Sequence, residues 1–479
     1  MAFFHGIKTS EIDTAVVATA QTTAGLPVVF GTAPVHLAEE PKINEPVICY
    51  SWSEAKKYLG YHEDWDKYTL CEPMYAEFKL FAVAPVVFIN VLDPAKHKKS
   101  VSSTSITVSR KSATINDDVI LSSLTVSATS AGSAAKAGTD YIVAYDDDGN
   151  TVISILEGGA LTDARNIYVA YDAVDVSLVK DADIIGGVGT NDAVTGMELI
   201  NYIYSRFSLV PGIIAAPGWS QHPEVAAVMR AKSRNINDVF RCSILTDIDT
   251  TEVKSYSGCN LWKSGNGYTG VAESVCWPMG KMGDHCYYMS TIEMGVIGQV
   301  DASNDDIPYE SPSNKSVPIT GLCLKDGTDV TLELTQANLL NSQGITTALN
   351  FGGGWRLWGN YTGAYPGSTD PKDTFLAVRR MFDWDDQVFI LTYWQRLDKP
   401  GVPRNIQIIL DSEQIRLNGL KSRGYILDGS VEFLEEENPT TDLEAGIFRF
   451  HKKRTPPIPM QEIDTISEYD VNAFNALFE

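Results

Sequence analysis

Asp247 and Asp249 are the residues of this chain best placed to act as general acids or bases. They end the largely apolar run "FRCSILTDID", which predicts a buried strand. In an open sheet of parallel strands, the carboxyl ends of the strands face the crevice where ligands bind. Paired carboxylates at that crevice could exchange protons with a substrate. The competing interpretation, which we favour, is two solvated aspartates in a loop.

The other chemistry-bearing residues lack the context that their reactions need. Ser220 and His222 stand two positions apart in a loop, whereas a nucleophile and its base are recognised by spatial geometry. "GNGYTG" at residues 265–270 matches a dinucleotide-binding pattern, but no convincing strand precedes it and no clear helix begins inside it. His285 and Cys286 are expected in a strand, one side chain inward and one outward. No serine-hydrolase, zinc-protease or P-loop motif is present, so we expect no catalytic, cofactor-binding or metal site.

Composition excludes several classes of protein. The chain has 479 residues, which suggests about three domains, and its 61 acidic against 38 basic residues give a net charge of −23. Nucleic-acid binding needs clustered lysine and arginine, so this balance argues against it. The longest apolar run, residues 81–92, is too short to span a membrane, and the N-terminus lacks signal-peptide features. Seven cysteines without a C-x-x-C pair suit free thiols, so we expect a cytoplasmic protein without membrane insertion.

The N-terminal part alternates between helix and buried-strand patterns. Ser51 and Glu54 have the spacing of a capping box, which predicts a helix that begins there and ends near Gly60. A second helix is expected over residues 73–81, followed by the buried strand "APVVFINVLDP". Residues 1–20 have the threonine and valine of an extended strand without a core of their own, so we interpret them as an arm.

Composition changes abruptly at residues 98–180, where serine, threonine and valine dominate and glycine and aspartate turns separate short alternating runs. This pattern predicts an all-β module inserted into an α/β region. Within it, "DDDGN" at residues 146–150 lacks the spacing of an EF-hand and predicts a hairpin turn. Beyond the module, helices expected over residues 193–207 and 223–235 alternate with strands, and Pro223 suits a first helical position. Such alternation implies parallel strands joined by helical crossovers.

A glycine run followed by tryptophans opens the C-terminal region. Glycine permits unusual backbone angles and tryptophan buries a large area, which together predict a close-packed structural turn. The residues concerned are Gly352, Gly353, Gly354, Trp355 and Trp358. A phosphate cradle would also need a lysine and a hydroxyl at fixed offsets, which are missing.

Two amphipathic helices and two strands are expected after this turn. Apolar residues at three- and four-residue steps over 375–382 predict the first helix, with Arg379 and Arg380 on its solvated face. The second helix should occupy residues 403–424. Alternation in "IFRFH" and in "MQEIDTISEYDV" predicts strands near the C-terminus.

Several of these segments resemble the contractile tail sheath proteins of phages and related injection particles. The resemblance rests on "WGN" at 358–360, Thr362, the helix carrying "VRR", the later "YWQ", "AGLPVVFGTAPVH" and "YESPSNKSVPITG". It does not cover the β insertion, and it departs at His5 and Tyr361, where the family has a proline and an arginine-like residue. The region after the insertion resembles the family's domain often described as subtilisin-like, a label for topology that does not imply proteolysis.

The sequence and this resemblance together predict an α/β fold with an inserted all-β module, a C-terminal α+β domain and extended N- and C-terminal arms. The expected divisions are an N-terminal arm (1–20), the first part of the α/β domain (21–97), the β module on the outer surface (98–180), the rest of the α/β domain with subtilisin-like topology (181–345), a C-terminal sheath core domain (346–444), and C-terminal strands with an arm (445–479).

The resemblance implies a structural subunit rather than an enzyme. Such a subunit polymerises as stacked rings, hexameric in the family, around an inner tube and contracts to drive the tube through a target cell envelope. Its partners would be copies of itself, the inner tail tube protein, and baseplate and tail terminator proteins, with no cofactor. It would assemble in a bacterial host cytoplasm and reside in a phage virion tail or a released phage-tail-like particle. An α/β hydrolase or nucleotide-binding enzyme is one alternative, and an adhesion protein built around the β module is another.

The resemblance also assigns roles to particular residues. The arms exchanged between subunits would contain Ile12, Val16, Val17, Phe448, Phe450, Ile463 and Ile466. The helix after Pro403 is the candidate for facing the tube, through Arg404, Arg416, Lys421 and Arg423, and a core helix with a solvated face is the alternative. Flexible connections are expected at residues 19–25 and 455–459.

Overall fold

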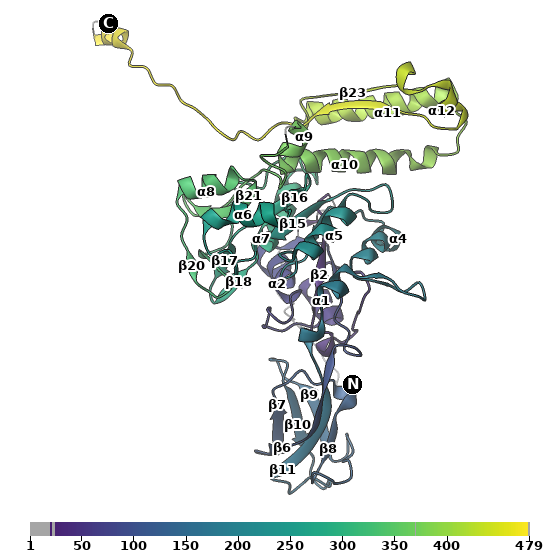
Figure 1. The fold of residues 1–479 in the computed structure, drawn as a ribbon, viewed down its shortest axis with the longest axis vertical. Helices are drawn as coiled ribbons and strands as arrows, with labels where there is room; N and C mark the ends of the chain where they lie inside the picture. Colours follow the sequence, from purple (N-terminus) through teal and green to yellow (C-terminus); the bar gives the residue numbers. More distant parts are fainter. Residues whose placement is uncertain (1–19, 22–23, 369, 478–479) are drawn as a thin grey trace, which may run out of the picture.

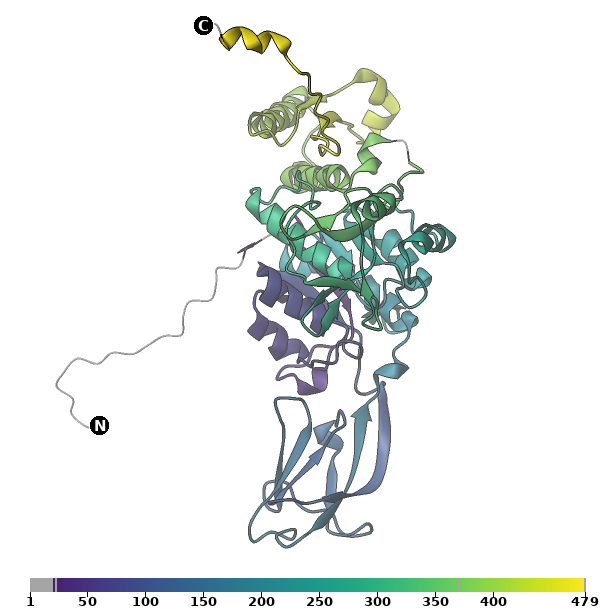
Figure 2. The ribbon, with the colours of Figure 1, turned by 90° about the vertical axis from the view of Figure 1, so that its left-hand side faces the viewer.

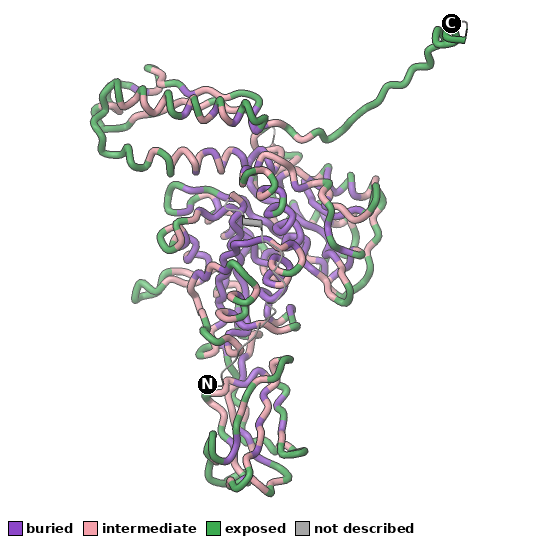
Figure 3. Tube along the Cα trace, turned by 180° about the vertical axis from the view of Figure 1, so that it is seen from behind, coloured by how far each residue is buried: buried purple, intermediate pink, exposed green. Residues whose placement is uncertain are grey.

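The computed structural model describes residues 20–21, 24–368 and 370–477, which form three tiers along one axis. A β module lies at one end, an α/β body in the middle, and two helices with a small sheet at the other end (Figures 1 and 2). Buried residues concentrate in the body, whereas the far end of the helix pair is intermediate or exposed (Figure 3). The fold is therefore mixed α/β.

An eight-stranded sheet forms the centre of the body. Its strand order is β22 (Trp355–Trp358), β21 (Ile345–Asn350), β16 (Glu273–Cys276), β15 (Ser243–Asp247), β14 (Ile213–Ala215), β2 (Pro27–Gly31), β5 (Val86–Asn90) and β3 (Val47–Cys49). The inner neighbours are all parallel, and only the two edge strands run antiparallel. Strands β2 and β5 are wholly buried because helices cover both faces of the parallel part.

Helices cover this sheet and begin where the sequence indicates. Helix α1 (Trp52–Leu59) starts at the predicted position: Ser51 Oγ accepts from the Glu54 amide, whereas the Glu54 carboxylate accepts at 2.7 Å from the amide of Tyr50, the residue before the N-cap, instead of from the Ser51 amide of a full capping box. Helix α5 (Pro223–Ser233) has its proline at the first turn. The other helices of the body are α2 (Cys71–Tyr75), the π-helical turn η2 (Ala76–Phe81), α6 (Cys259–Gly265), α7 (Met289–Ser303) and α8 (Leu334–Asn341).

Two helix predictions in the body need correction. Most of the segment expected as one helix over residues 193–207 forms β13 (Val194–Thr195), the 3-10 helix η5 (Gly196–Tyr202) and α4 (Ile203–Phe207). Gly196 has a φ of 58°, which a regular helix cannot contain. The sequence also failed to predict α7, because this helix is buried nearly all round and has no amphipathic pattern.

The β module is built from two three-stranded sheets with their own apolar core. One has the order β6 (Lys98–Thr107), β11 (Asn166–Val174), β8 (Thr125–Ser127); the other has β7 (Ser112–Ile115), β10 (Thr151–Ile155), β9 (Tyr141–Tyr145). Val126, Ile153, Ile167 and Val169 are buried between the sheets. Residues 146–150 make the expected hairpin turn, in which Asp146 Oδ1 accepts from the Asn150 amide at 2.8 Å.

Short elements complete the body and its connections. They are β1 (Ala20–Gln21), η1 (Val35–Leu37), β4 (Val83–Ala84), η3 (Leu121–Ser123), η4 (Val176–Leu178), α3 (Asp181–Ile185), β12 (Gly187–Val188), η6 (Tyr256–Gly258), β17 (Met279–Met282), β18 (His285–Tyr287), β19 (Gly321–Cys323) and β20 (Asp329–Val330).

The glycine-tryptophan turn is a surface hairpin rather than a close-packed corner. Gly352, Gly353 and Gly354 join β21 to β22 with positive φ angles, and a Cβ added to any of them would meet nothing within 4 Å. Trp355 and Trp358 are half-buried, and Trp358 Nε1 donates to Asn338 Oδ1 at 3.0 Å. The glycines serve the tight antiparallel connection, which requires positive φ rather than close packing.

Candidate assembly interface

Two long helices and a two-stranded sheet form the tier farthest from the β module. Helix α10 (Leu376–Tyr393) follows the short helix α9 (Pro371–Thr374), and the turn η7 (Trp394–Arg396) leads to α11 (Pro403–Ser422). Strand β23 (Asp428–Glu432) pairs antiparallel with β24 (His451–Thr455); η8 (Glu435–Glu437) and α12 (Thr440–Glu444) lie between them. We call α10, α11, β23 and β24 the hairpin tier (Figure 1).

Buried ion pairs hold the first turns of α10 on the body. Arg379 Nη2 lies 2.8 Å from Asp383 Oδ1, and Arg234, at the end of α5, donates to both oxygens of Asp383 at 2.6 and 3.0 Å. Arg380 Nη1 donates to Asp301 Oδ1 at 3.1 Å. The predicted solvated face was therefore wrong: Arg380 is buried against Asp301 of α7, and Arg379 is buried beside Asp383, which also binds Arg234 at the end of α5.

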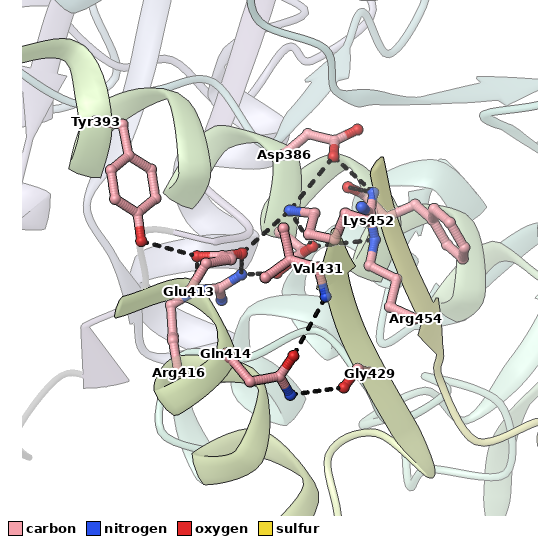
Figure 4. A network of polar contacts seen from close by, with 11 residues as sticks. Asp386, Tyr393, Glu413, Gln414, Arg416, Gly429, Val431, Lys452 and Arg454 are labelled. Atoms are coloured by element: carbon pink, nitrogen blue, oxygen red, sulfur yellow. Dashed lines mark hydrogen bonds and ion pairs between the residues drawn. The ribbon is translucent and has the colours of Figure 1, made fainter. Parts of the chain in front are cut away.

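A second ionic cluster fastens β24 to both long helices (Figure 4). Lys452 Nζ and Arg454 Nε lie 2.7 and 3.0 Å from Asp385 Oδ2. Arg416 Nε donates to Glu413 Oε2 at 3.0 Å, and its guanidinium also contacts Asp385. The carboxylates of Asp385 and Glu413 are 1% and 0% exposed, and these cations, together with the Tyr393 hydroxyl that donates to Glu413 at 3.4 Å, compensate their burial.

The charges of this cluster set the protonation state of Asp385. Burial alone would raise the pKa of its carboxyl, but Lys452, Arg454 and Arg416 outweigh burial and hold that pKa below its usual value. Arg454 Nη2 also lies 2.6 Å from Asp386 Oδ1. Asp385, Asp386 and Glu413 thus face Arg416, Lys452 and Arg454, and the cluster is neutral when all are ionised.

The small sheet has one blocked edge and one open edge. Gln414 of α11 donates to the Gly429 carbonyl at 3.0 Å and accepts from the Val431 amide at 3.3 Å, which satisfies the outer edge of β23 (Figure 4). Among the described residues, no strand pairs with the opposite edge of β24. An unpaired edge of this kind is a template for an additional strand.

The chain beyond β24 leaves the molecule as an extended arm that ends in the 3-10 helix η9 (Val471–Leu477) (Figure 1). Residues 460–470 have no regular secondary structure, so the strand predicted over "MQEIDTISEYDV" does not form within the single chain. The side chains of Ile463 and Ile466 are largely in solvent, at 76% and 97% exposure. An alternating segment needs a neighbouring edge to become a strand, and this arm has none in its own chain.

The remaining predicted arm residues fall into two groups. Phe448 and Phe450 are half-buried in the hairpin tier, where Phe450 packs on Phe389 and Phe433 and Phe448 covers Gly401. Of "IFRFH", only the histidine belongs to β24. Ile12, Val16 and Val17 lie outside the described residues.

The four proposed tube-facing cations differ in their availability. Arg404 is exposed at the start of α11, Lys421 pairs with Asp428 at 2.8 Å on the surface, and Arg423 is exposed beside Asp305. Arg416 is instead occupied by Glu413 and Asp385. Sequence periodicity located the helix but could not identify this internal pairing.

The candidate catalytic residues of the body make structural contacts. Asp247 is 4% exposed, it accepts from the Ser290 amide at 3.0 Å and from Ser220 Oγ at 3.2 Å, and burial raises its pKa to about 6. Asp249 accepts from the amide and hydroxyl of Thr251 in a local turn. His222 pairs with Asp181 at 2.6 Å, away from the Ser220 hydroxyl bonded to Asp247. These contacts assemble no nucleophile with its base.

The other motifs are also structural. Helix α6 ends at Gly265, so "GNGYTG" does not open a helix as a dinucleotide site requires. The ring of His285 stacks on Trp65 with centroids 4.3 Å apart, and Cys286 is half-buried beside it. In the described part of the chain, no group of three His, Cys, Asp or Glu side chains could hold a metal ion, and no helix is long and apolar enough to cross a membrane.

Comparisons with known proteins show what this chain is similar to. No family model matches the chain. It is 26% identical to the tail sheath protein of Burkholderia phage BcepMu over 98% of each chain, and 25% identical to the tail sheath protein of Escherichia phage P2 over 59% of this chain and 69% of that one. Its homologues are tail sheath proteins. The contracted sheath complex of the extracellular contractile injection system PVC shares the fold, with a TM-score of 0.57 at 12% identity over 99% of each chain.

The resemblance to contractile sheath proteins is thus confirmed. In a sheath homologue, the buried polar groups around Asp247 have a structural explanation, and the hydrolase or nucleotide-enzyme alternative is not favoured. The open edge of β24 and the unpaired arm are two features that have no strand partner among the described residues.

Proposed function

We propose that this chain is the subunit of a contractile tail sheath that polymerises around an inner tube as helically stacked rings. The observation that carries the proposal is the combination of an open β24 edge with a C-terminal arm of alternating apolar and polar residues that pairs with no strand among the described residues. Each subunit then offers one edge and one strand, a heterologous contact that can link copies within a ring and from one ring to the next.

Charge supports a particular pairing between copies. The segment 456–479 carries Glu462, Asp464, Glu468, Asp470 and Glu479 and no lysine or arginine, whereas β24 reads "HKKRT". Lys452 and Arg454 are engaged in the buried cluster, so the cross-strand attraction for an acidic arm would come from the exposed Lys453, in addition to main-chain hydrogen bonds. The N-terminal arm, with Ile12, Val16 and Val17, would pair with a further subunit in the same manner.

The proposal includes an orientation in the particle. The hairpin tier would face the inner tube, with Arg404, Lys421 and Arg423 as contacts, and the β module would face outward. The domain division at residues 20, 97, 180, 345 and 444 and the hexameric ring belong to the same proposal. The ends of the sheath would meet baseplate and tail terminator proteins.

Contraction would proceed without an enzymatic step. Subunits rotate and slide as near-rigid bodies from a metastable extended packing into one of lower free energy, while exchanged strands keep them linked. The connections that absorb this movement would be residues 19–25 and 455–459. Breaking the exchanged strands instead would leave several buried amides unpaired. Assembly would occur in a bacterial cytoplasm, followed by residence in a virion tail or released particle.

Removal of the C-terminal arm tests the proposal. A chain lacking residues 460–479 should remain folded, because residues 460–474 are exposed. It should run as a small species in size-exclusion chromatography and form no tubes in negative-stain microscopy. A subtler variant is Thr465→Pro combined with Ile466→Pro, since one of two successive prolines must remove a main-chain bond from any strand formed there. Thr465→Ser is the matched control and should assemble normally. Long tubes from the truncated chain would refute arm exchange.

A further inference from the structure

The end of the β module remote from the body contains a polar cavity of about 550 Å³. Strands β6 and β11 join the body at their Lys98–Val174 end, and the cavity lies at the other end, where Thr107 is paired with Asn166 (Figure 1). Two loops and one strand form its walls. The lining residues are Ala128, Thr129, Ser130, Gly159, Ala160, Thr162, Asp163, Ala164, Arg165, Asn166 and Tyr168.

The backbone of the walls is braced before any ligand binds. Asp140 accepts from the amides of Ala160 and Lys136 at 2.8 and 2.7 Å, and these backbone hydrogen bonds hold the pKa of its carboxyl below the usual value. Thr162 Oγ1 donates to the Gly159 carbonyl at 2.7 Å. On the opposite wall, Ser127 Oγ donates to the Thr129 carbonyl at 2.8 Å. Loops held in this way lose little conformational freedom when a ligand binds.

In contrast, four of the polar side chains that line the cavity have no hydrogen-bond or ion-pair partner among the described residues. Within the described part of the chain, no hydrogen bond or ion pair uses the side chains of Asp163, Arg165, Asn166 or Tyr168. Asp163, Arg165 and Asn166 are exposed, and Tyr168 is half-buried on β11. A fixed backbone that presents solvent-facing polar side chains without protein partners leaves those side chains available to a ligand.

The types of these side chains define the class of ligand. Asp163 accepts hydrogen bonds, Arg165 donates them, and Asn166 does both, which suits adjacent hydroxyl groups that each donate and accept. Tyr168 adds a flat ring that can cover the C–H face of a sugar, together with a polar hydroxyl. The opposite charges of Asp163 and Arg165 cancel, which disfavours a phosphate or other strongly anionic ligand. The polar lining equally disfavours a lipid.

We propose that this cavity binds a neutral sugar residue of a polysaccharide or glycan. The proposal goes beyond sheath assembly, because the cavity is distant from β24 and from the arm. Sheath polymerisation would repeat the site along the particle, so a weak single-site affinity would be multiplied through avidity.

Saturation-transfer difference NMR on the full-length chain tests this site with glucose, galactose, mannose and N-acetylglucosamine as probes. At least one sugar should receive saturation on its ring protons and be displaced by an excess of its own methyl glycoside. Asp163→Ala and Asn166→Ala change exposed side chains and should keep the fold, yet each should reduce the transferred signal at least tenfold. Tyr168→Ala should abolish it. Tyr202→Ala, an exposed tyrosine on the body, is the matched control and should leave the signal unchanged.

Three results would overturn the proposal. The first is the absence of transfer to every sugar at millimolar concentration. The second is a signal of equal strength in the Asp163→Ala and Asn166→Ala variants, which would place binding elsewhere. The third is preferential binding of inorganic phosphate or of glucuronate over the neutral sugars, since Arg165 would then act alone as an anion site. None of these results bears on tube formation, which is measured separately with the arm variants.

Discussion

The β module and the hairpin tier project from opposite ends of the body, but they distribute apolar and charged residues in opposite ways (Figure 1). The module buries apolar residues such as Ile153 and Ile167 and keeps ion pairs such as Lys98–Asp172 at its surface. The hairpin tier buries the carboxylates of Asp385 and Glu413 and leaves Trp394, Leu397 and Ile415 exposed. Both regions have an apolar core, but the hairpin tier adds buried carboxylates and a group of exposed apolar side chains, an arrangement that favours contact with other chains.

The largest expected effect comes from breaking the ionic cluster of the hairpin tier. Asp385→Ala leaves Lys452, Arg454 and Arg416 without their shared counter-charge in a buried site, and loss of one partner of a buried pair costs about 3–5 kcal/mol. Strand β24 should detach, which hydrogen exchange of the amides of residues 451–455 would detect, and tubes should be lost. Asp428→Ala removes only the exposed partner of Lys421 and should change stability by less than about 0.5 kcal/mol. Equal effects of the two variants would contradict the role of the cluster.

The body and the hairpin tier should respond to pH in opposite directions. Burial raises the pKa of Glu72 to about 8, that of Glu293 to about 7 and that of Asp247 to about 6. A carboxyl whose pKa is raised in the folded state binds its proton more tightly there than in the unfolded chain. The stability that this proton contributes is complete at pH values below the unfolded pKa, and it is lost as the pH rises through the folded pKa. The pKa of Asp385 is lowered instead, so its contribution is present above the unfolded pKa and is lost on acidification.

Glu72→Gln removes a carboxyl whose pKa is raised in the folded state. The unfolding free energy of this variant should therefore fall less between pH 5 and pH 9 than that of the unchanged chain, by about 1.4 kcal/mol for each unit by which the pKa of Glu72 is raised. Urea unfolding monitored by tryptophan fluorescence at both pH values would measure it. Glu63→Gln is the matched control, because Glu63 is exposed at the same end of the body. An unchanged slope in Glu72→Gln would show that this carboxyl does not carry the effect.

Deletion of the β module should have a smaller effect on assembly. Lys98 and Val174 are cross-strand partners, so the two ends of the module are close and a short glycine linker can replace residues 98–180. The body loses the contacts of Asp118 with Lys67 and His36, but not its own sheet. Tubes should still form, as judged by negative-stain microscopy. A folded deletion protein that forms no tubes would place the module inside the lattice.

The smallest effect is expected from surface charges of the hairpin tier. Arg404→Glu combined with Lys421→Glu should weaken extended assembly guided by the inner tube and spare contracted polymers formed without it. Arg416 is left out because its substitution would break the buried cluster. Lys254→Glu, an exposed charge on the body, is the control. Equal loss of both polymer types in a cosedimentation assay would indicate a role in the lattice rather than at the tube.

Local sequence determined the elements whose signals act within a few residues. These signals are backbone preferences or burial periodicities that can be read directly from neighbouring residues. They include the capping-box spacing of Ser51 and Glu54, the proline that opens α5, the continuous apolar run of β5 and the alternating runs of the β module. The resemblance to sheath proteins likewise rested on short motifs in a fixed order, and the comparisons confirm it.

Tertiary structure alone decided which charges are internal and which strands are paired. Arg380 lies 79 positions from Asp301, and Arg454 lies 68 positions from Asp386, so the spacing of residues within a helix or a strand does not predict these pairs. The arm over residues 460–470 alternates like a strand but pairs with no strand among the described residues, because pairing depends on an edge within reach and not on local sequence alone. Helix signals are local, whereas ion pairing and strand pairing depend on partners that only the fold, or a neighbouring subunit, brings into contact.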